Sequence, residues 1–363
     1  MPKRRRINWV FSDIVRWFLT TKYEWRAKLR GEAFYCSALA GEAEYNITIN
    51  CDGTVTCNCQ DYDGSGNLGD LNQHSFKDVF FGPKAQSFRE SLAKGKLPIH
   101  TCARCGDLRR IKKSKLNEIK TRLPYRGMLL ENTVRCNVDC IGCDRTQAAG
   151  LRKTKLMELD KLAKMADLVK ELGLQQLFYL NLGEPFLSPN IGKEMPLLRE
   201  KNPDCRIVIS TNAIILNTDA KREAAMYASH IYFSIHGIDN AMLKKYGMGE
   251  NFDKAYANLK AIVEYRNARG LKRPILEWKY VLFNWNDKHW MIERAIEMAK
   301  EAKVDAISFW PAGNPFYGIS YRYRLGFLND IGVKTWKGRE VDLRAVKDPP
   351  LDFVPPQPVP VMA

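Results

Sequence analysis

Several features that define other classes of protein are missing from this sequence. No stretch reaches the roughly 18 consecutive apolar residues of a membrane span, and the N-terminal apolar segment is interrupted by Asp13 and Arg16 before any small-residue cleavage site. No internal repeat is present. We therefore expect a cytoplasmic protein without an export signal, in which ten cysteines serve as metal ligands or catalysts rather than in disulfides.

Composition indicates an ordinary globular protein with an excess of positive charge. The 363 residues are 45% hydrophobic and 11% aromatic, enough for a large core, and we expect one large domain plus a smaller one. The net charge of +16 favours an anionic partner, which leaves nucleic acid, anionic lipid and an acidic redox protein as alternatives.

The most informative segment is "RCNVDCIGCDR", in which Cys136, Cys140 and Cys143 form a C-x3-C-x2-C pattern. A structural zinc site is closed by four ligands, but here no fourth cysteine or histidine follows closely. Three thiolates in one loop leave a coordination position open, and an open position on a metal centre is where substrate chemistry takes place.

Alternating strand and helix patterns predict the fold after residue 128. Six apolar, strand-like runs are "GMLLENTV", "LFYLNL", "RIVIST", "HIYFSIH", "ILEWKYVLF" and "AISFW". Helical periodicity separates them, as in "KLMELDKLAKMADLVKEL". Six β/α units predict a parallel sheet, either doubly wound or closed part of the way into a barrel.

The remaining sequence divides the chain into four expected segments. They are a basic amphipathic N-terminal segment (1–45), a cysteine-rich module (46–120), the β/α region (121–320) and a C-terminal extension with a proline-rich tail (321–363). Turn residues dominate the module around "CDGTVTCNCQDYDGSGNLGDLNQ", so we expect cysteines rather than a core to hold it together. The tail is expected to be extended or disordered.

The three-cysteine loop after the first strand resembles that of the radical SAM superfamily. The resemblance extends over residues 128–312 and implies an α/β fold, a partial (β/α)6 TIM-like barrel with a small cysteine-rich module before it. It also implies a 4Fe-4S cluster on Cys136, Cys140 and Cys143, with S-adenosylmethionine (SAM) on the open iron. Reductive cleavage of SAM would give a 5'-deoxyadenosyl radical that takes hydrogen from a substrate carbon.

The same resemblance implies SAM-binding residues at the ends of the strands, where barrel enzymes place their active sites. Gly183-Glu184-Pro185 in "NLGEPFL" is similar to the family's motif for the methionine amino group, with Asn181-Leu182 in place of its first positions. The sequence identifies no residue that would donate or accept hydrogen. The candidate SAM-binding residues are Ile141, Gly183, Glu184, Pro185, Ser210, Asn212, Ser234, His236, Lys279, Trp310 and Pro311.

A second set of cysteines resembles the SPASM-type auxiliary cluster module. Cys57 and Cys59 follow "DGTVT", and Cys102 and Cys105 form "CARC"; in the family the module follows the barrel, whereas here it precedes it. The resemblance implies a second 4Fe-4S cluster on these four thiolates, but zinc fits four cysteines equally well. Cys51 is the substitute if Cys57 is not a ligand.

We read Cys36 and Cys205 as ordinary buried residues. Neither belongs to a spacing pattern of its own in the sequence, and free cysteine is among the most often buried residue types.

The resemblance implies a flavodoxin- or ferredoxin-like electron donor and leaves the substrate open. Residues 1–45 lack a strand-rich leader-binding pattern, so we expect a sugar-type or other small-molecule substrate, and we expect no nucleic-acid partner. The alternative is modification of a peptide, protein or RNA. A further alternative is a zinc-stabilised, non-enzymatic nucleic-acid binder.

The N-terminal segment has the pattern of an interfacial amphipathic helix. Ile7, Val10, Phe11, Ile14, Trp17 and Phe18 recur at helical spacing beside basic residues. This predicts peripheral contact with an anionic membrane, and the alternative is a helix packed on the protein's own body.

Overall fold

The computed structural model describes residues 3–59, 61–335 and 337–344, so the proline-rich tail predicted after residue 348 lies outside the described residues. The chain divides into two compact units. Unit 1 comprises Met1–Arg135 and Asp144–Gly183, and unit 2 comprises Cys136–Cys143 and Glu184–Ala363. The two units are defined by contacts within the structure and do not test the boundaries of the four segments expected from the sequence. Those four segments remain a prediction.

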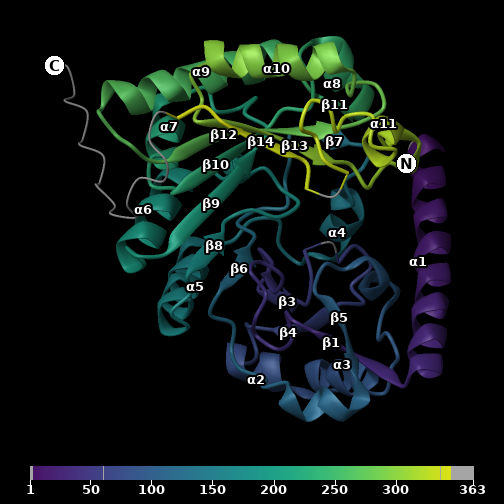
Figure 1. The fold of residues 1–363 in the computed structure, drawn as a ribbon. Coiled ribbons are helices and arrows are strands. Elements are labelled where there is room, and N and C mark those ends of the chain that lie inside the picture. Colours follow the sequence, from purple (N-terminus) through teal and green to yellow (C-terminus); the bar gives the residue numbers. More distant parts are fainter. Residues whose placement is uncertain (1–2, 60, 336, 345–363) are drawn as a thin grey trace. The chain divides into compact units, whose positions relative to one another are not determined.

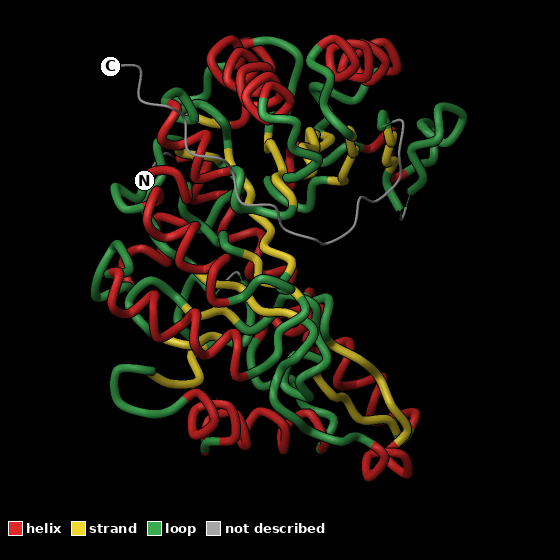
Figure 2. Tube along the Cα trace, turned by 90° about the vertical axis from the view of Figure 1, so that its left-hand side faces the viewer, coloured by secondary structure: helices red, strands yellow, loops and turns green. Residues whose placement is uncertain are grey.

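Unit 1 contains the long N-terminal helix, the cysteine-rich region and the first strands of the β/α pattern (Figures 1 and 2). Its helices are α1 (Lys3–Arg30), α2 (Phe76–Phe81), α3 (Pro83–Ala93), α4 (Arg145–Leu151) and α5 (Leu159–Glu171), with short 3-10 segments η1 (His100–Arg104) and η2 (Lys113–Glu118). Its strands are β1 (Glu32–Cys36), β2 (Thr48–Ile49), β3 (Thr54–Thr56), β4 (Asn67–Asp70), β5 (Leu108–Lys112), β6 (Gly127–Leu130) and β8 (Gln176–Phe178).

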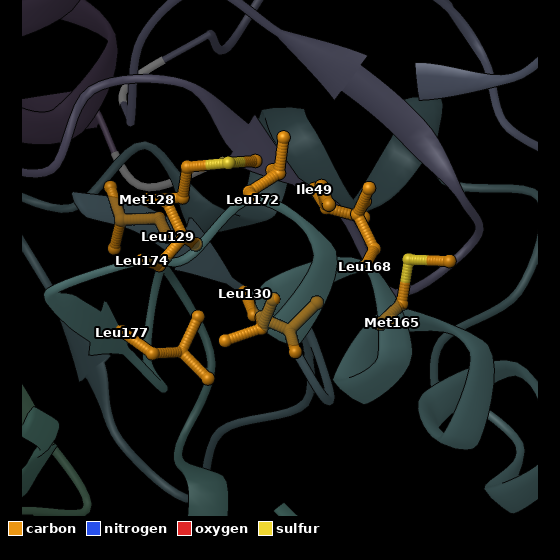
Figure 3. Close-up of a pocket in the computed structure, with 10 residues that line it drawn as sticks. Ile49, Met128, Leu129, Leu130, Met165, Leu168, Leu172, Leu174 and Leu177 are labelled. Carbon is orange, nitrogen blue, oxygen red and sulfur yellow. The ribbon is translucent and has the colours of Figure 1, made fainter. Parts of the chain in front are cut away.

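The strands of unit 1 join the cysteine-rich region to the β/α pattern. Their order is β4-β3-β2-β6-β8, with β2, β6 and β8 parallel and the β2-β3-β4 meander antiparallel. Strands β1 and β5 form a separate antiparallel pair. An apolar cavity between the strands and α5 is lined by leucine, methionine, isoleucine and valine alone (Figure 3). With no polar group to hold a ligand or a water molecule, it is a packing gap in the core.

The cysteine-rich region also has a core of its own. Phe34, Leu92, Leu97 and Ala103 form a buried cluster together with Ala27 of α1. The expectation that cysteines rather than a core hold this region together is therefore wrong. The sequence spreads these apolar residues over more than seventy positions, and only the fold gathers them.

Unit 2 contains the cysteine loop and the later β/α repeats. Its helices are α6 (Ile191–Lys201), α7 (Asp219–Ala225), α8 (Asn240–Tyr246), α9 (Phe252–Ala268), α10 (His289–Glu301) and α11 (Tyr321–Arg324), with 3-10 segments η3 (Pro185–Leu187) and η4 (Phe316–Gly318). Its strands are β7 (Asp139–Cys140), β9 (Arg206–Thr211), β10 (His230–Ser234), β11 (Gly247–Met248), β12 (Ile275–Leu282), β13 (Ala306–Pro311) and β14 (Arg339–Asp342).

The sheet of unit 2 is parallel except at its edge. The order is β9-β10-β12-β13-β14, and only β14 runs antiparallel. Helices α9 and α10 lie along one face of these strands (Figure 1). Trp278 and Tyr280 are fully buried, and the Trp278 ring lies against Phe252 and Tyr256 of α9. These aromatic side chains therefore pack under the helices and leave the opposite face of the sheet to other residues.

Helix α1 packs on unit 1 with one face and exposes the other. Arg16, Thr20 and Ala27 are buried on the inner face. The outer face carries large apolar side chains that are between 58% and 64% exposed, namely Ile14, Trp17, Phe18, Trp25 and Leu29. In the part of the chain that the structure describes, no helix is long and apolar enough to cross a membrane.

Candidate active site and iron-sulfur sites

The cysteine loop of unit 2 is held in place by backbone pairing with the segment after α8. Strand β7, which contains Cys140, pairs antiparallel with β11, and Ile141 donates its N–H to the Tyr246 carbonyl over 2.9 Å. An added Cβ on Gly142 would lie 2.7 Å from the Asn314 carbonyl oxygen, so only glycine permits this close approach. The loop is thus fixed on both sides.

The thiols of this loop lie close enough together for Cys136 and Cys143 to affect the protonation of Cys140. Burial raises the pKa of Cys140 well above its ordinary value, and Glu250, Cys143 and Cys136 raise it further. Cys136 accepts the Val138 N–H over 3.5 Å and lies 3.9 Å from the Asn212 Nδ2 atom. Thiols that are neutral when unbound must lose protons to bind iron, so cluster binding would release protons.

Glu184 is a buried carboxylate that fastens the end of β9. Its Oε1 atom accepts from the Thr211 hydroxyl at 2.8 Å and from Phe186 N at 3.3 Å, and its Oε2 atom accepts from Asn212 N at 2.8 Å. Burial raises its pKa from 4.5 to about 7, although these three bonds oppose the shift. A carboxylate has about four acceptor positions, so one on Oε2 is left for a further donor.

Asn212 connects Glu184 to the cysteine loop. Its backbone N–H bonds Glu184, while its side chain donates to Asn137 over 2.9 Å and lies beside the Cys136 sulfur. Asn137 was missed in the sequence because a single asparagine inside a cysteine loop carries no distinctive pattern. The structure thus joins Glu184 and Cys136 through Asn212, all three of them predicted, and adds Asn137, which was not predicted.

Gly183, at the end of unit 1, fits the same strand-end motif for a steric reason. An added Cβ would lie 1.9 Å from the Thr133 carbonyl oxygen, a distance that no side chain tolerates. Pro185 follows Glu184 as the first residue of η3 and is buried.

Ser210, Ser234, Lys279 and Trp310 share one face of the sheet of unit 2. In the parallel register Ser234 pairs with Lys279, and Lys279 pairs with Ser308, so their side chains point to the same side. The Ser210 and Ser234 hydroxyls are 2.9 Å apart. The Lys279 ammonium lies 4.7 Å from the Trp310 ring centre, and Trp310 bonds the Ser308 hydroxyl over 2.8 Å. This face is polar, in contrast to the face under α9 and α10.

His236 is a neutral hydrogen-bonding group. Its Nδ1 atom accepts the Val281 N–H over 3.2 Å, and burial lowers its pKa to about 3, with Lys279 lowering it further. The proton of the neutral ring therefore lies on Nε2, where it is a donor for a ribose or a carboxylate. Of the last two candidates, Ile141 is half-buried in the loop and Pro311 is exposed at the end of β13.

The auxiliary thiols in unit 1 include one that the sequence did not single out. Burial raises the pKa of Cys57, and neighbouring Cys102 and Cys105 raise it further. Burial also raises the pKa of Cys36, and the neighbouring thiols of Cys105 and Cys57 raise it further. Burial raises the pKa of Cys102 to about 12, with Cys36 and Cys105 contributing. Cys36 therefore belongs to this thiol group.

Cys59 and Cys51 stand in different surroundings. The Cys59 N–H donates to the Asn46 Oδ1 atom over 3.3 Å, and burial raises the pKa of Tyr45, with the Cys59 thiol raising it further. Cys51 donates its thiol hydrogen to the Thr154 carbonyl, and the charges acting on it come from Glu131, Asp52 and Arg152. These surroundings favour Cys57 over Cys51 as a ligand.

The spacing of these side chains bears on the kind of metal group that fits. Within the described ranges, no three His, Cys, Asp or Glu side chains converge as ligands of a single ion. Four zinc-bound sulfurs at about 2.3 Å from one ion lie only about 4 Å apart, whereas a cluster spreads its thiolates over several iron atoms. The cysteines of unit 1 supply enough thiolates for either kind of metal group.

Comparison with known proteins assigns the class. Residues 130–275 match the Radical SAM superfamily, and residues 36–106 match the SPASM iron-sulfur cluster-binding domain, a match that begins at Cys36. The protein is therefore an α/β enzyme with two iron-sulfur regions. It belongs to the radical SAM superfamily and carries its SPASM region before the radical SAM region. The family matches confirm the predicted fold class, SAM, the 4Fe-4S cluster and the auxiliary iron-sulfur cluster, and the non-enzymatic zinc hypothesis is wrong.

Solved structures with a similar fold are distant in sequence. TYW1 with a lysine-pyruvate adduct is 16% identical, with 48% of this chain and 60% of that chain covered and a TM-score of 0.36. The anSMEcpe protein with bound AdoMet and Cp18Cys peptide is 16% identical, with 56% and 59% covered and a TM-score of 0.43. The chain thus spans about 60% of the length of these structures. No curated protein matches the chain.

The geometry around Glu184 predicts a pH-dependent binding of SAM. Replacing Glu184 with Gln removes a charge-assisted bond, so SAM should bind with roughly 1.5 to 3 kcal/mol less free energy, or about 10- to 150-fold more weakly. In the unchanged protein the ammonium prefers the ionised carboxylate, so affinity should rise as the pH passes upward through about 7. Equilibrium binding of SAM from pH 6 to about 8, at unchanged cluster absorbance, measures both effects.

The same experiment contains its own control. Glu250, whose pKa burial also raises to about 7, titrates in the same range. If the pH dependence persists in Glu184→Gln, Glu250 and not Glu184 is its source. Equal affinity in the variant and the unchanged protein would show that Glu184 only fastens the end of β9.

Proposed function

We propose that this radical SAM enzyme binds SAM at the strand ends of unit 2 and acts on a substrate held against the polar face of that sheet. The observation that carries the proposal is the hydrogen-bonded series from Cys136 through Asn212 to Glu184. A cluster held by Cys136, Cys140 and Cys143 would supply one electron to the sulfonium of SAM, chemistry that would give methionine and a 5'-deoxyadenosyl radical able to take hydrogen from an unactivated carbon.

The protein's own residues then have positioning roles. Glu184 would hold the methionine ammonium, and neutral His236 would donate its Nε2 hydrogen to the ribose or carboxylate. Lys279 is the cation on the same face, near Trp310, and is a second candidate partner for the carboxylate. The fixed loop around Gly142 keeps the three thiols in place while SAM binds.

We further propose that Cys36, Cys57, Cys102 and Cys105 hold the auxiliary cluster, with Cys59 as the alternative fourth ligand. The mutual effect of these thiols on their pKa values supports the first set. Asn46 lies between the two alternatives, because its side chain contacts both the Cys59 N–H and the Cys105 sulfur.

Two substrate classes suit the polar face of unit 2. Its hydroxyl, ammonium and indole groups bond equally well to a polymer backbone and to the hydroxyls of a sugar. The net charge of +16 favours an extended anionic partner, so modification of a peptide, protein or RNA is our first candidate. A sugar-type small molecule, expected from the sequence, is the second.

Deuterium transfer would distinguish these classes. A lysate from cells grown in deuterated medium is separated into macromolecules and small molecules, and each fraction is incubated anaerobically with the reconstituted enzyme, SAM and dithionite. Hydrogen abstraction should place deuterium in 5'-deoxyadenosine, detected by mass spectrometry, only with the fraction that holds the substrate. No 5'-deoxyadenosine in any sample would contradict SAM cleavage itself.

The exposed face of α1 supports the predicted peripheral contact with an anionic membrane. Trp17, Phe18 and Trp25 are exposed together with Lys22 and Lys28, a combination typical of interfacial helices. Cytoplasmic location likewise stays a prediction. Co-sedimentation with anionic liposomes, and its loss in Trp17→Glu, measures the membrane contact, and unchanged sedimentation of the variant would contradict it.

A further inference from the structure

A polar cavity of about 320 Å³ lies beside the second half of α1 in unit 1. Its walls come from α1, the start of β1, the turn after α3 and the start of η2. This volume is near the lower end of the range for small-molecule pockets. The charged residues of its lining are Glu24, Lys28, Glu32, Lys94, Lys96 and Lys113.

Hydrogen bonds fix the walls of this cavity and engage one of its carboxylates. The Leu97 N–H donates to the Glu24 Oε1 atom over 2.9 Å, and the Lys96 ammonium donates to Oε2 over 3.0 Å. The Lys113 N–H donates to the Gly31 carbonyl over 3.3 Å. Glu24 and Lys96 therefore already serve the structure of the cavity.

Glu32, the first residue of β1, is a carboxylate of a different kind. In the described part of the chain its side chain forms no hydrogen bond or ion pair, and its Oε2 atom is buried. A buried carboxylate oxygen without a donor carries an uncompensated desolvation cost. The cavity therefore favours an occupant that brings N–H donors to Glu32.

Three lysines of the lining supply the opposite charge. Lys28, Lys94 and Lys113 are exposed, and none of them forms an ion pair with a residue in the described ranges. Lysine ammonium groups bind phosphate as point charges. Cations for a phosphate, together with a carboxylate for an ammonium group, match the two charges of a phosphoethanolamine.

Trp25 connects the cavity to the exposed apolar face of α1. It belongs to the lining and is 62% exposed, and Leu29, one turn further along the helix, is 64% exposed. A lipid with its headgroup in the cavity would have its acyl chains beside these apolar side chains, as at an interfacial helix. A bilayer lipid therefore uses both features, whereas a soluble compound uses only one.

We propose that this cavity binds the headgroup of phosphatidylethanolamine, with the phosphate held by the lysines and the ammonium by Glu32. This rests on the proposed membrane contact of α1 and names the lipid that the contact recognises. Phosphatidylcholine fits less well, because its trimethylammonium group has no N–H to donate to Glu32. Sites for that group use cages of aromatic rings, whereas Trp25 is the one aromatic residue among the described residues of this lining.

Soluble headgroups test the cavity without any membrane. In a titration followed by ligand-observed NMR, the full chain should bind glycerophosphoethanolamine at least fivefold more tightly than glycerophosphocholine. Glu32→Gln keeps the size of the side chain but removes its charge, and should abolish this preference. The matched control is Glu90→Gln, the same charge change at an exposed position of α3 outside the cavity, which should keep the preference.

A second variant tests the phosphate partners and serves if Glu32→Gln does not fold. Lys28→Gln/Lys94→Gln should bind both headgroups at least threefold more weakly. Unchanged affinity in this variant would overturn the proposal. Equal binding of the two headgroups by the unchanged protein, or an intact preference in Glu32→Gln, would overturn it as well.

Vesicles separate the cavity from the apolar face of α1. At equal phosphatidylglycerol content, vesicles that contain phosphatidylethanolamine should retain at least threefold more protein than vesicles that contain phosphatidylcholine instead. Glu32→Gln should lose this difference, whereas Trp17→Glu should lose retention on both kinds of vesicle. A difference that persists in Glu32→Gln would arise from bilayer packing and would overturn the proposal.

The two arms also distinguish failure of the cavity from failure of the membrane contact. Equal retention of the unchanged protein on both vesicles would overturn the headgroup assignment and leave the membrane contact of α1 standing. Binding of soluble glycerophosphoethanolamine without retention on either vesicle would contradict the membrane contact. That result would overturn the lipid assignment and give the cavity to a soluble phosphoethanolamine compound.

Discussion

Replacing Cys136, Cys140 and Cys143 together with alanine should abolish SAM cleavage and leave a protein that is still brown. The three thiolates leave the fourth position of their cluster open to SAM, so without them no cluster remains where SAM binds. The auxiliary thiols belong to unit 1, whereas the loop belongs to unit 2 and is held there by its pairing with β11. The auxiliary cluster should therefore survive, with about four irons retained.

Three measurements on the triple variant check this expectation. Iron and sulfide analysis should show a loss of about half the wild-type content, visible absorbance should persist, and 5'-deoxyadenosine should be absent with dithionite. Zinc in place of the retained iron would contradict the auxiliary cluster. A variant with neither iron nor zinc would show that the cysteines of unit 1 hold no metal.

Replacing Cys36 with alanine should remove the auxiliary cluster, whereas the same change at Cys59 should retain it. Cys36 shares its surroundings with Cys57, Cys102 and Cys105, while the Cys59 N–H donates to the Asn46 side chain and the Cys59 thiol acts on Tyr45. Iron content in Cys36→Ala should fall by about half, and uncoupled cleavage of SAM should continue because the loop of unit 2 is intact.

The paired design distinguishes ligand loss from unfolding. Cys36 also packs against the apolar cluster around Phe34, and truncating a small buried side chain costs about 1 kcal/mol. Cys205→Ala, at a buried cysteine of unit 2 outside the thiol group, is the matched control for such a loss. Retention of all iron in Cys36→Ala, with loss in Cys59→Ala, would restore Cys59 as the fourth ligand.

The sequence predicted the β/α architecture well because its signals are local. Each of the six apolar runs overlaps a strand of the structure, namely β6, β8, β9, β10, β12 and β13. Strand β14 was missed because "REVD" alternates too briefly and carries too much charge to stand out. The cysteine loop was found because three ligands of one cluster fall within eight positions.

Other features depend on contacts that are distant in the chain. Cys36 lies more than sixty positions before Cys102, and nothing near it in the sequence marks it as part of the thiol group. Asn137 and Glu250 become relevant only because one bonds Asn212 and the other lies 3.8 Å from the Cys140 sulfur. The strand pattern does not show which way Trp278 and Tyr280 point; the packing of Trp278 on α9 and the hydrogen bond from the Tyr280 hydroxyl to the Asn286 carbonyl fix their directions.

The sequence by itself thus determined the superfamily and the order of strands and helices, and it predicts the three thiolates of the SAM cluster, because spacing along a single loop or strand encodes them. Only the tertiary structure decided which thiols gather in unit 1, which face of the sheet is polar, and that Glu184 already holds the end of β9. The physical reason is that burial and charge depend on neighbours in space. Loop closure brings those neighbours together from positions that no local pattern connects.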